Sequence, residues 1–395
     1  MMKNIFVLIL SVFFTVSFVE AQTKEKTNYE IKAKISGLNA SKIEFRIVDK
    51  ENPKGKWIKS DVNKDHFTYK GYVAEPTLMY FNFDDNAVKK YSSPDKRGYF
   101  MSPVSLLAFV ASPGIDVKVN GKMSGFINAY PSGDFENITL AKLTSKLHPV
   151  LNKSMDLLTE LGDKSLSKEK VDELKALRKP IDQEINNIKL EFVKKNISSI
   201  AGLSTCRSIL GSLISVDEAP KYFNKISSKY KTSRYYKELM ERYHNLISER
   251  KNKELTKEGA AVPEIKTTNT LDGKEFNLKS LRGKYVLLDF WGTWCGACVN
   301  GMPHMKAFRD KHSSTFQIVG VAQESRNLSP WRNLIKSKGL NWPHIYVDKS
   351  DSNYVKLFGI SAFPTKILIS PEGKILLRHV GEDPEFYKEL EKIIK

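Results

Sequence analysis

Two cysteines placed shortly after an apolar strand constrain this chain more than any other feature. The apolar run Tyr285–Phe290 is followed by the sequence Trp-Cys-Gly-Ala-Cys at residues 294–298. A short apolar run of this kind predicts a buried strand, and the cysteines then fall where a helix is expected to begin. A thiolate at a helix N-terminus is stabilised by unpaired N–H groups and by the positive end of the helix dipole. The pattern therefore predicts a reversible dithiol/disulfide pair formed by Cys295 and Cys298.

The first residues predict an export signal. The apolar run from Ile5 to Val19 follows Met1–Lys3 and is shorter than the roughly 20 apolar residues that a membrane span needs. Because Val19 and Ala21 fit the small-residue positions before a cleavage site, we interpret residues 1–21 as a signal peptide. The alternative is an uncleaved anchor. We expect the mature protein in the periplasm or cell envelope, without an integral membrane segment.

Cysteine number and charge exclude two classes of protein. Three cysteines in an exported chain of 395 residues are too few for a disulfide framework. The odd one, Cys206, lies in an apolar stretch and is predicted to be buried and unreactive, with a third redox partner as the alternative. The formal net charge is +18, but no segment is a concentrated basic arm, so we expect no nucleic-acid partner.

The period of the apolar residues changes along the chain and predicts a multidomain protein. Alternation with period two predicts an antiparallel β N-terminal domain over residues 22–130. Helical spacing predicts an α-helical middle region over 131–250, with Pro180 and Gly202 expected to break the run into several helices. The charged segment 251–260 contains Gly and Ala, which indicates a linker.

Beyond the linker, strand and helix patterns alternate, which predicts a C-terminal α/β domain over 261–395. The predicted strands are Val286–Phe290, Gln317–Ala322, His344–Val347, Lys366–Ile369 and Ile375–Val380. The predicted helices are Cys295–Lys311, Pro330–Lys338, Asn353–Phe358 and Glu385–Ile394.

Residues 258–395 resemble the thioredoxin superfamily, in its exported thiol–disulfide oxidoreductase branch built around TlpA and ResA. The resemblance is carried by the segments Leu278–Cys298, Met302-Pro303, Phe358–Thr365, Ile369–Lys374 and Gly381. The long segment between Cys298 and Pro364 suits this branch, which carries an insertion that ordinary thioredoxins lack. The β and helical regions resemble the front half of two-part envelope proteins from Bacteroidetes-type bacteria, whose thioredoxin-like module is C-terminal.

This resemblance implies a role for the residues around the cysteine pair. Cys295 would attack a substrate disulfide and form a mixed disulfide, which Cys298 would resolve. Asp289 takes the position of the family's buried acid, where a raised pKa suits proton exchange with Cys298. The alternative for Asp289 is a structural carboxylate at the strand end.

The resemblance also implies a substrate-binding rim. Pro364 matches the family's cis-proline and would present the backbone of Phe363 to an extended substrate, with an ordinary trans turn as the alternative. We expect Trp294, Phe363 and Thr365 to bind substrate, the first two as an apolar rim. Trp291 is expected to pack in the core.

Two positions depart from the family's pattern. Gly296-Ala297 stands where Gly-Pro is common, which is expected to alter helix rigidity and reduction potential. Gly301 stands where many members of the branch carry a glutamate, so no role of that glutamate, in cysteine tuning or in cytochrome c maturation, is carried over. Glu324 is a candidate substitute acid, although a surface position is the favoured interpretation.

Other chemistries are disfavoured by the residue pattern. One Cys-x-x-Cys supplies two of the roughly four ligands of a zinc site, and the sequence shows no second half-site, so we expect no metal and no cofactor. A peroxiredoxin would need Pro and Thr where Leu288 and Gly292 stand. No histidine lies in the thioredoxin motifs for a Cys–His hydrolase, and His304 and His379 are expected as surface or strand residues.

We therefore expect an exported protein-disulfide oxidoreductase. Its partners would be protein disulfides or thiols, with a membrane-linked electron donor, and reduction is the expected direction. The main rival is an envelope binding module, in which residues 22–250 select a protein or glycan and the thioredoxin-like domain is secondary. Loss of disulfide reduction in Cys295→Ser would separate the two.

Overall fold

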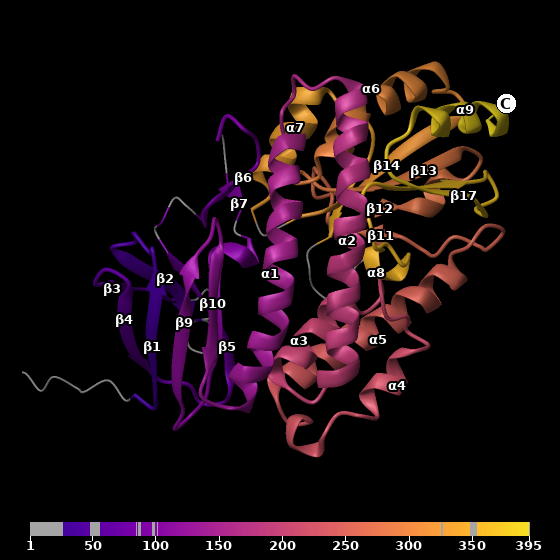
Figure 1. Ribbon diagram of the computed structural model, residues 1–395. Helices are drawn as coiled ribbons and strands as arrows, with labels where there is room; N and C mark the ends of the chain where they lie inside the picture. Colours follow the sequence, from indigo (N-terminus) through magenta and orange to yellow (C-terminus); the bar gives the residue numbers. More distant parts are fainter. Residues whose placement is uncertain are drawn as a thin grey trace, which may run out of the picture. The chain divides into compact units, whose positions relative to one another are not determined.

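The computed structural model describes residues 27–47, 56–83, 85, 88–96, 99–100, 102–324, 327–347 and 354–394 (Figure 1). The chain divides into two compact units, residues 1–202 and 203–395, with the boundary inside helix α3 (Ile200–Ile209). The predicted signal peptide, residues 1–21, lies outside the described residues. Across the described ranges, no helix has both the length and the apolar character needed to span a bilayer.

The first unit contains two four-stranded sheets around one apolar core. The first sheet has the order β10-β9-β1-β4, with β1 (Tyr29–Ser36), β4 (His66–Gly71), β9 (Asp116–Met123) and β10 (Ile127–Ser132). The second has the order β3-β2-β5-β8, with β2 (Lys42–Ile47), β3 (Lys56–Asp61), β5 (Thr77–Phe83) and β8 (Leu106–Ala111). A two-stranded pair joins β6 (Lys90–Tyr91) and β7 (Tyr99–Phe100), and a 3-10 turn covers Pro103–Ser105.

The alternation seen in the sequence builds this core. Ile31 and Ile35 of β1 are buried, while the lysines between them are exposed, as a period of two requires. Side chains of both sheets, among them Phe67, Phe81 and Phe109, meet in one cluster. The predicted β domain is confirmed, with one difference: β1 pairs with β9 in parallel, while its other neighbour is antiparallel.

Two long helices follow, α1 (Phe135–Leu161) and α2 (Lys168–Asn196), and they run side by side (Figure 1). The side chain of Asp134 caps α1, and that of Ser167 caps α2, by accepting from backbone N–H groups of the first turn. Pro180 lies inside α2, so the predicted break there is wrong. The buried stripe of α2, which includes Leu174, Ile185 and Phe192, continues past the proline and holds the helix together.

Gly202 lies inside α3 and does not end a helix, which also differs from the prediction. A Cβ at this position would meet the backbone oxygen of Asn196 at 1.8 Å. The glycine therefore allows the start of α3 to approach the end of α2 closely. The chain turns between the two helices, over residues 197–199.

The second unit begins with helical residues and leads directly into the α/β module. Its further helices are α4 (Ala219–Phe223), a 3-10 turn at Ser228–Tyr230, and α5 (Arg234–Leu255). Helix α5 extends into the segment 251–260, which we predicted as a linker. Thr256 is fully buried, and the Arg378 guanidinium donates to its carbonyl and its hydroxyl. Ala260 accepts from the N–H of Ile375, so this segment is fixed against the module.

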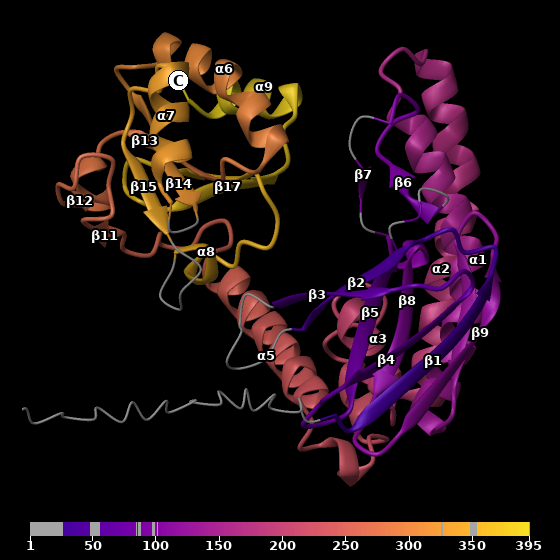
Figure 2. The same ribbon diagram turned by 90° about the vertical axis from the view of Figure 1, so that its left-hand side faces the viewer.

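The α/β module is a five-stranded sheet covered on both faces (Figure 2). The order is β15-β14-β13-β16-β17, with β13 (Tyr285–Trp291), β14 (Phe316–Gln323), β15 (His344–Val347), β16 (Thr365–Ile369) and β17 (Ile375–Val380). The helices are α6 (Gly296–Lys311), α7 (Ser329–Lys338), α8 (Tyr354–Leu357) and α9 (Pro384–Ile393). A hairpin of β11 (Lys266–Thr267) and β12 (Phe276–Asn277) precedes a 3-10 turn at Leu278–Leu281. Strands β13, β14 and β15 are parallel, whereas β16 and β17 are antiparallel, and the predicted thioredoxin-like order of elements is confirmed.

Alternation along β13 decides which side of the sheet each residue faces. Leu287 and Trp291 pack in the layer formed with α6, α7 and α9. Leu288 and Phe290 pack in the opposite layer, which contains α8 and the β11–β12 region. Because side chains alternate with period two, Asp289 faces the same layer as the cysteine helix α6.

Candidate active site

The cysteine pair stands at the beginning of α6. Cys295 is the N-cap residue, its sulfur accepts from the Cys298 N–H at 3.2 Å, and the two sulfurs form a disulfide of 2.00 Å. Cys295 is 8% exposed and Cys298 is 2% exposed, so the first sulfur is the more accessible one. When the pair is reduced, the helix N-terminus favours a thiolate at this position.

An aromatic pair lies next to the first cysteine. Trp294 is 58% exposed, and its ring packs edge to face on Phe363 with the centroids 5.1 Å apart. The Trp294 indole N–H donates to the backbone oxygen of Gln323 at 2.9 Å, which fixes the ring. The Phe363–Pro364 peptide is cis, as the resemblance implied. This arrangement presents an apolar surface beside Cys295.

Thr365 has a buried side chain. It is 1% exposed, and its hydroxyl donates to the backbone oxygen of Ala362 at 2.7 Å. The hydroxyl closes the turn around Pro364, and the expected contact of Thr365 with substrate stays a prediction. The N–H of Gly381 also holds this turn by donating to the Pro364 carbonyl at 2.8 Å.

Asp289 is a buried carboxyl on the cysteine side of the sheet. It is 3% exposed, and burial raises its pKa to about 6, an effect that Lys366 opposes and Glu382 reinforces. Lys366 lies directly opposite Asp289 in the β13–β16 register. The ammonium of Lys366 is 3.9 Å from Asp289 Oδ1 and 2.6 Å from Glu382 Oε2.

Glu324 is buried, which corrects the expected surface position. It is 4% exposed and accepts from the Thr293 N–H at 2.7 Å and from the Thr293 hydroxyl at 3.0 Å. Strands β13 and β14 are parallel, with Trp291 opposite Ala322, so the segments that follow them meet at one edge of the sheet. Glu324 thereby holds the turn that leads into Trp294 and Cys295.

Replacing Glu324 with alanine is expected to lower the free energy of unfolding by about 1–3 kcal/mol, because the Thr293 N–H would lose its acceptor. The measurement is urea denaturation of the oxidised protein. Glu385→Ala, at a carboxylate whose side chain is 70% exposed, is the matched control and is expected to change little. Equal losses in the two variants would contradict the assigned role of Glu324.

Several other predicted residues are placed clearly by the structure. Cys206 is fully buried, and burial raises the pKa of its thiol to about 12, which fits an unreactive thiol. Trp291 packs in the core, and His304 is exposed. His379 lies on β17 and stacks on Phe386 with the ring centroids 4.7 Å apart.

The sequence analysis missed two charged residues of the site, Lys366 and Glu382. A signal for the first was present, because Lys366 is the charged first residue of an otherwise apolar predicted strand. A lysine in such a strand is almost never buried without a partner, so an acid nearby could have been expected. Glu382 lies after β17, where no local pattern marks it.

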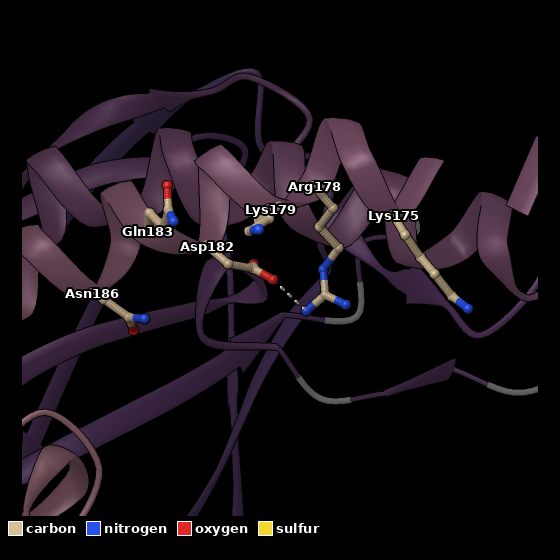
Figure 3. Close-up of a pocket in the computed structure, with 6 residues that line it drawn as sticks. All are labelled: Lys175, Arg178, Lys179, Asp182, Gln183 and Asn186. Atoms are coloured by element: carbon tan, nitrogen blue, oxygen red, sulfur yellow. Dashed lines mark ion pairs between the residues drawn. The ribbon is translucent and has the colours of Figure 1, made fainter. Parts of the chain in front are cut away.

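A separate groove lies in the first unit. It has a volume of about 280 Å³ and follows α2, where Arg178 and Asp182 form an ion pair (Figure 3). Lys175, Lys179, Gln183 and Asn186, which also line it, are exposed. The groove contains no cysteine. Among the residues that the structure describes, no three His, Cys, Asp or Glu side chains gather to hold a metal ion.

Comparison with known proteins places the α/β module in a family. The Redoxin family matches residues 257–394. The thiol-disulfide oxidoreductase ResA of Bacillus thuringiensis is 31% identical over 145 residues, which cover 36% of this chain and 80% of the relative. ResA of Bacillus subtilis is 37% identical over 126 residues, which cover 31% of this chain and 68% of the relative.

Solved structures give similar matches over the same part of the chain. The thioredoxin domain of a thiol-disulfide oxidoreductase from Bacteroides vulgatus is 28% identical, with a TM-score of 0.33, covering 35% of this chain and 99% of that domain. A putative thiol:disulfide interchange protein DsbE from Chlorobium tepidum is 27% identical, with a TM-score of 0.32, and the match covers 34% of this chain and 94% of that protein. Through its C-terminal module, this chain belongs to the ResA-like thiol-disulfide oxidoreductases of the redoxin family.

Proposed function

We propose that this protein is an exported oxidoreductase that reduces protein disulfides with the dithiol of Cys295 and Cys298. The observation that carries the proposal is the cysteine pair at the start of α6, with the more exposed sulfur beside Trp294 and Phe363. A nucleophilic sulfur next to an apolar, backbone-presenting rim suits an extended polypeptide substrate.

The reaction follows from the positions of the two sulfurs. The Cys295 thiolate attacks one sulfur of the substrate disulfide, the substrate S–S bond breaks, and one substrate thiolate leaves and takes up a proton. Cys298 then loses its proton and attacks the Cys295 sulfur, which breaks the mixed disulfide and releases the second substrate thiol. Two electrons pass to the substrate, and the protein retains the Cys295–Cys298 disulfide, the form that the structure holds.

Asp289 would accept the proton that Cys298 loses. With its pKa raised to about 6, mainly by burial, the carboxyl is mostly ionised at pH 7 and still holds a proton readily. Its place on the same side of the sheet as α6 supports this role. In the resolving step, Cys298 would therefore give its proton to Asp289 as it attacks the mixed disulfide.

Export and the direction of electron flow rest on the sequence. The predicted signal peptide at residues 1–21 supports a location in the periplasm or cell envelope. Asp289 and the resemblance to the exported thiol–disulfide oxidoreductase branch support a reductant, which a membrane-linked electron donor would re-reduce. We also propose the predicted domain limits, 22–130, 131–250 and 261–395, with 251–260 as the segment between the last two.

A trapping experiment tests the proposal. Cys298→Ser cannot resolve the mixed disulfide, so in the native envelope we expect discrete proteins joined to Cys295, identified by mass spectrometry after non-reducing separation. The control is the double variant Cys295→Ser/Cys298→Ser, which should trap none. Absence of trapped proteins, with a reactive Cys295 thiol in the purified protein, would contradict the proposal and favour the binding-module alternative.

A further inference from the structure

A row of charged side chains leads from the buried Asp289 and Lys366 to the partly exposed Glu382. The side chain of Lys366 is 1% exposed, and its ammonium is bound by Glu382 at 2.6 Å, closer than the 3.9 Å to Asp289. Tyr387 donates its hydroxyl proton to Glu382 Oε1 at 2.9 Å. Among the described residues, Asp289 Oδ1 has no hydrogen-bond partner although it is buried. Glu382, therefore, holds the lysine away from the carboxyl that faces the cysteine helix.

The strand register places these groups in one row. Asp289 of β13 lies opposite Lys366 of β16, which lies opposite His379 of β17. Leu368, two residues after Lys366, packs in the layer that contains α6 and α9. Because the period is two, Lys366 points into the same layer as Asp289. The position of the Lys366 side chain is thus set by its place in the sheet and by its ion pair with Glu382.

Gly301 makes room for the second carboxylate. A Cβ at Gly301 would lie 2.2 Å from Glu382 Cδ and 2.2 Å from its Oε2, closer than any real side chain is found. Gly301 is in α6, three residues after Cys298, so the Glu382 carboxylate lies against the helix of the resolving cysteine. The Glu382 carboxylate, from the segment between β17 and α9, therefore occupies the space that a side chain at position 301 would fill.

We propose that Glu382 and Lys366 are positioning residues that set the proton affinity of Asp289 and thereby the pH at which Cys298 resolves the mixed disulfide. Glu382 acts in two ways: its negative charge opposes ionisation of Asp289, and it keeps the Lys366 ammonium at a distance. The link to the pH at which Cys298 resolves the mixed disulfide rests on the proposed proton exchange between Asp289 and Cys298.

The charged and titratable groups on this side of the sheet come from each surrounding element. Among the described residues they include Lys366 from β16, Glu382 from the segment before α9, Tyr387 from α9, His379 from β17, and Cys298 and His304 from α6, the last with its ring centroid 6.1 Å from that of Tyr387. Burial, first, and then the Glu382 charge raise the pKa of Tyr387, so it stays a neutral donor. Lys366 and Glu382 are therefore the two groups whose charges act on Asp289 with opposite sign.

Opposite signs give a sharp test. In Glu382→Gln the negative charge is lost and Lys366 is free to move toward Asp289, so the protonation midpoint of Asp289 is expected to fall by about one pH unit. In Lys366→Met the cation is lost, and the midpoint should rise by a similar amount. Gly301→Ala keeps both charges but displaces the Glu382 carboxylate, and it should lower the midpoint. Glu385→Gln is the matched control and should leave it unchanged.

The midpoint is measured directly in the oxidised full-length protein by carbon NMR of labelled aspartate carboxyls, with Asp289→Asn to assign the signal. In the reduced protein, reaction with 5,5′-dithiobis(2-nitrobenzoate) releases one thiolate on attack by Cys295 and a second when Cys298 resolves the mixed disulfide. The rate of the second release, followed against pH by stopped flow, is expected to shift with the Asp289 midpoint.

Each outcome decides the matter. Shifts of opposite sign in Glu382→Gln and Lys366→Met support the positioning role, which a purely structural contribution would not produce. If Lys366→Met does not fold, Gly301→Ala and Glu382→Gln still decide. An unchanged Asp289 midpoint in both of these variants would overturn the inference. Midpoints that move while the second thiolate release does not follow would support the positioning role and contradict the proposed proton exchange with Cys298.

Discussion

Cys295→Ser is expected to lower the protein-catalysed rate of insulin disulfide reduction more than about a thousand-fold. The total rate should then equal that of the dithiothreitol in the assay alone. The serine hydroxyl ionises far above neutral pH and does not attack disulfides, and Cys298 is only 2% exposed and cannot replace the first sulfur. The measurement is the turbidity of reduced insulin in the presence of dithiothreitol, with the full-length mature protein.

Cys206→Ala is the matched control for this experiment. Cys206 is fully buried and lies outside the α/β module, so its loss should leave the reduction rate unchanged within about twofold. Substantial activity in Cys295→Ser would contradict the assignment of Cys295 as the attacking sulfur. Loss of activity in both variants, with both folded, would point to the third cysteine as a redox partner.

Asp289→Asn is expected to stabilise the oxidised protein at alkaline pH. The pKa of Asp289 is raised from 3.8 to about 6, mainly by burial, so between these values the folded chain keeps a proton that the unfolded chain has lost. Stability therefore falls as the pH rises through this window, by about 3 kcal/mol in total, and stays low above it. The variant should gain about 2–3 kcal/mol at pH 8 and nothing below about pH 4.

Urea denaturation from pH 4 to pH 8, followed by tryptophan fluorescence, measures this difference. Trp291, Trp294, Trp331 and Trp342 lie in the α/β module, so the signal reports mainly on it. Glu254→Gln, at a carboxylate whose side chain is 70% exposed, is the control and should show no such pH dependence. A difference between wild type and Asp289→Asn that does not change with pH would contradict a raised pKa at Asp289.

The fold of the α/β module was largely predictable from local patterns. The apolar run that became β13 and the cysteines that begin α6 are each marked within a few residues of sequence, whereas the cis bond at Pro364 was implied by the resemblance alone. The N-terminal β domain was recognised by its alternation, but the parallel pairing of β1 with β9 was not. Strand partners far apart in sequence carry no local signal, since both pairings bury the same side chains.

The breaks predicted at Pro180 and Gly202 show where local reasoning fails. Proline and glycine are weak helix formers in isolation, but tertiary packing overrides this preference. In α2 the buried face continues past the proline, and in α3 the glycine is required by the neighbouring Asn196 carbonyl. The segment 251–260 is similar, because its composition indicates a linker while Thr256 and Ala260 are bound to the module.

The sequence by itself determined the redox pair, the order of the α/β elements and the position of Asp289, because each depends on residues a few positions apart. Only the tertiary structure placed Glu324 under Thr293 and brought Glu382 to Lys366 and Gly301. These contacts join segments that are distant along the chain and meet only when the sheet is assembled. The electrostatic environment of the buried acid is therefore a property of the assembled sheet and its helices.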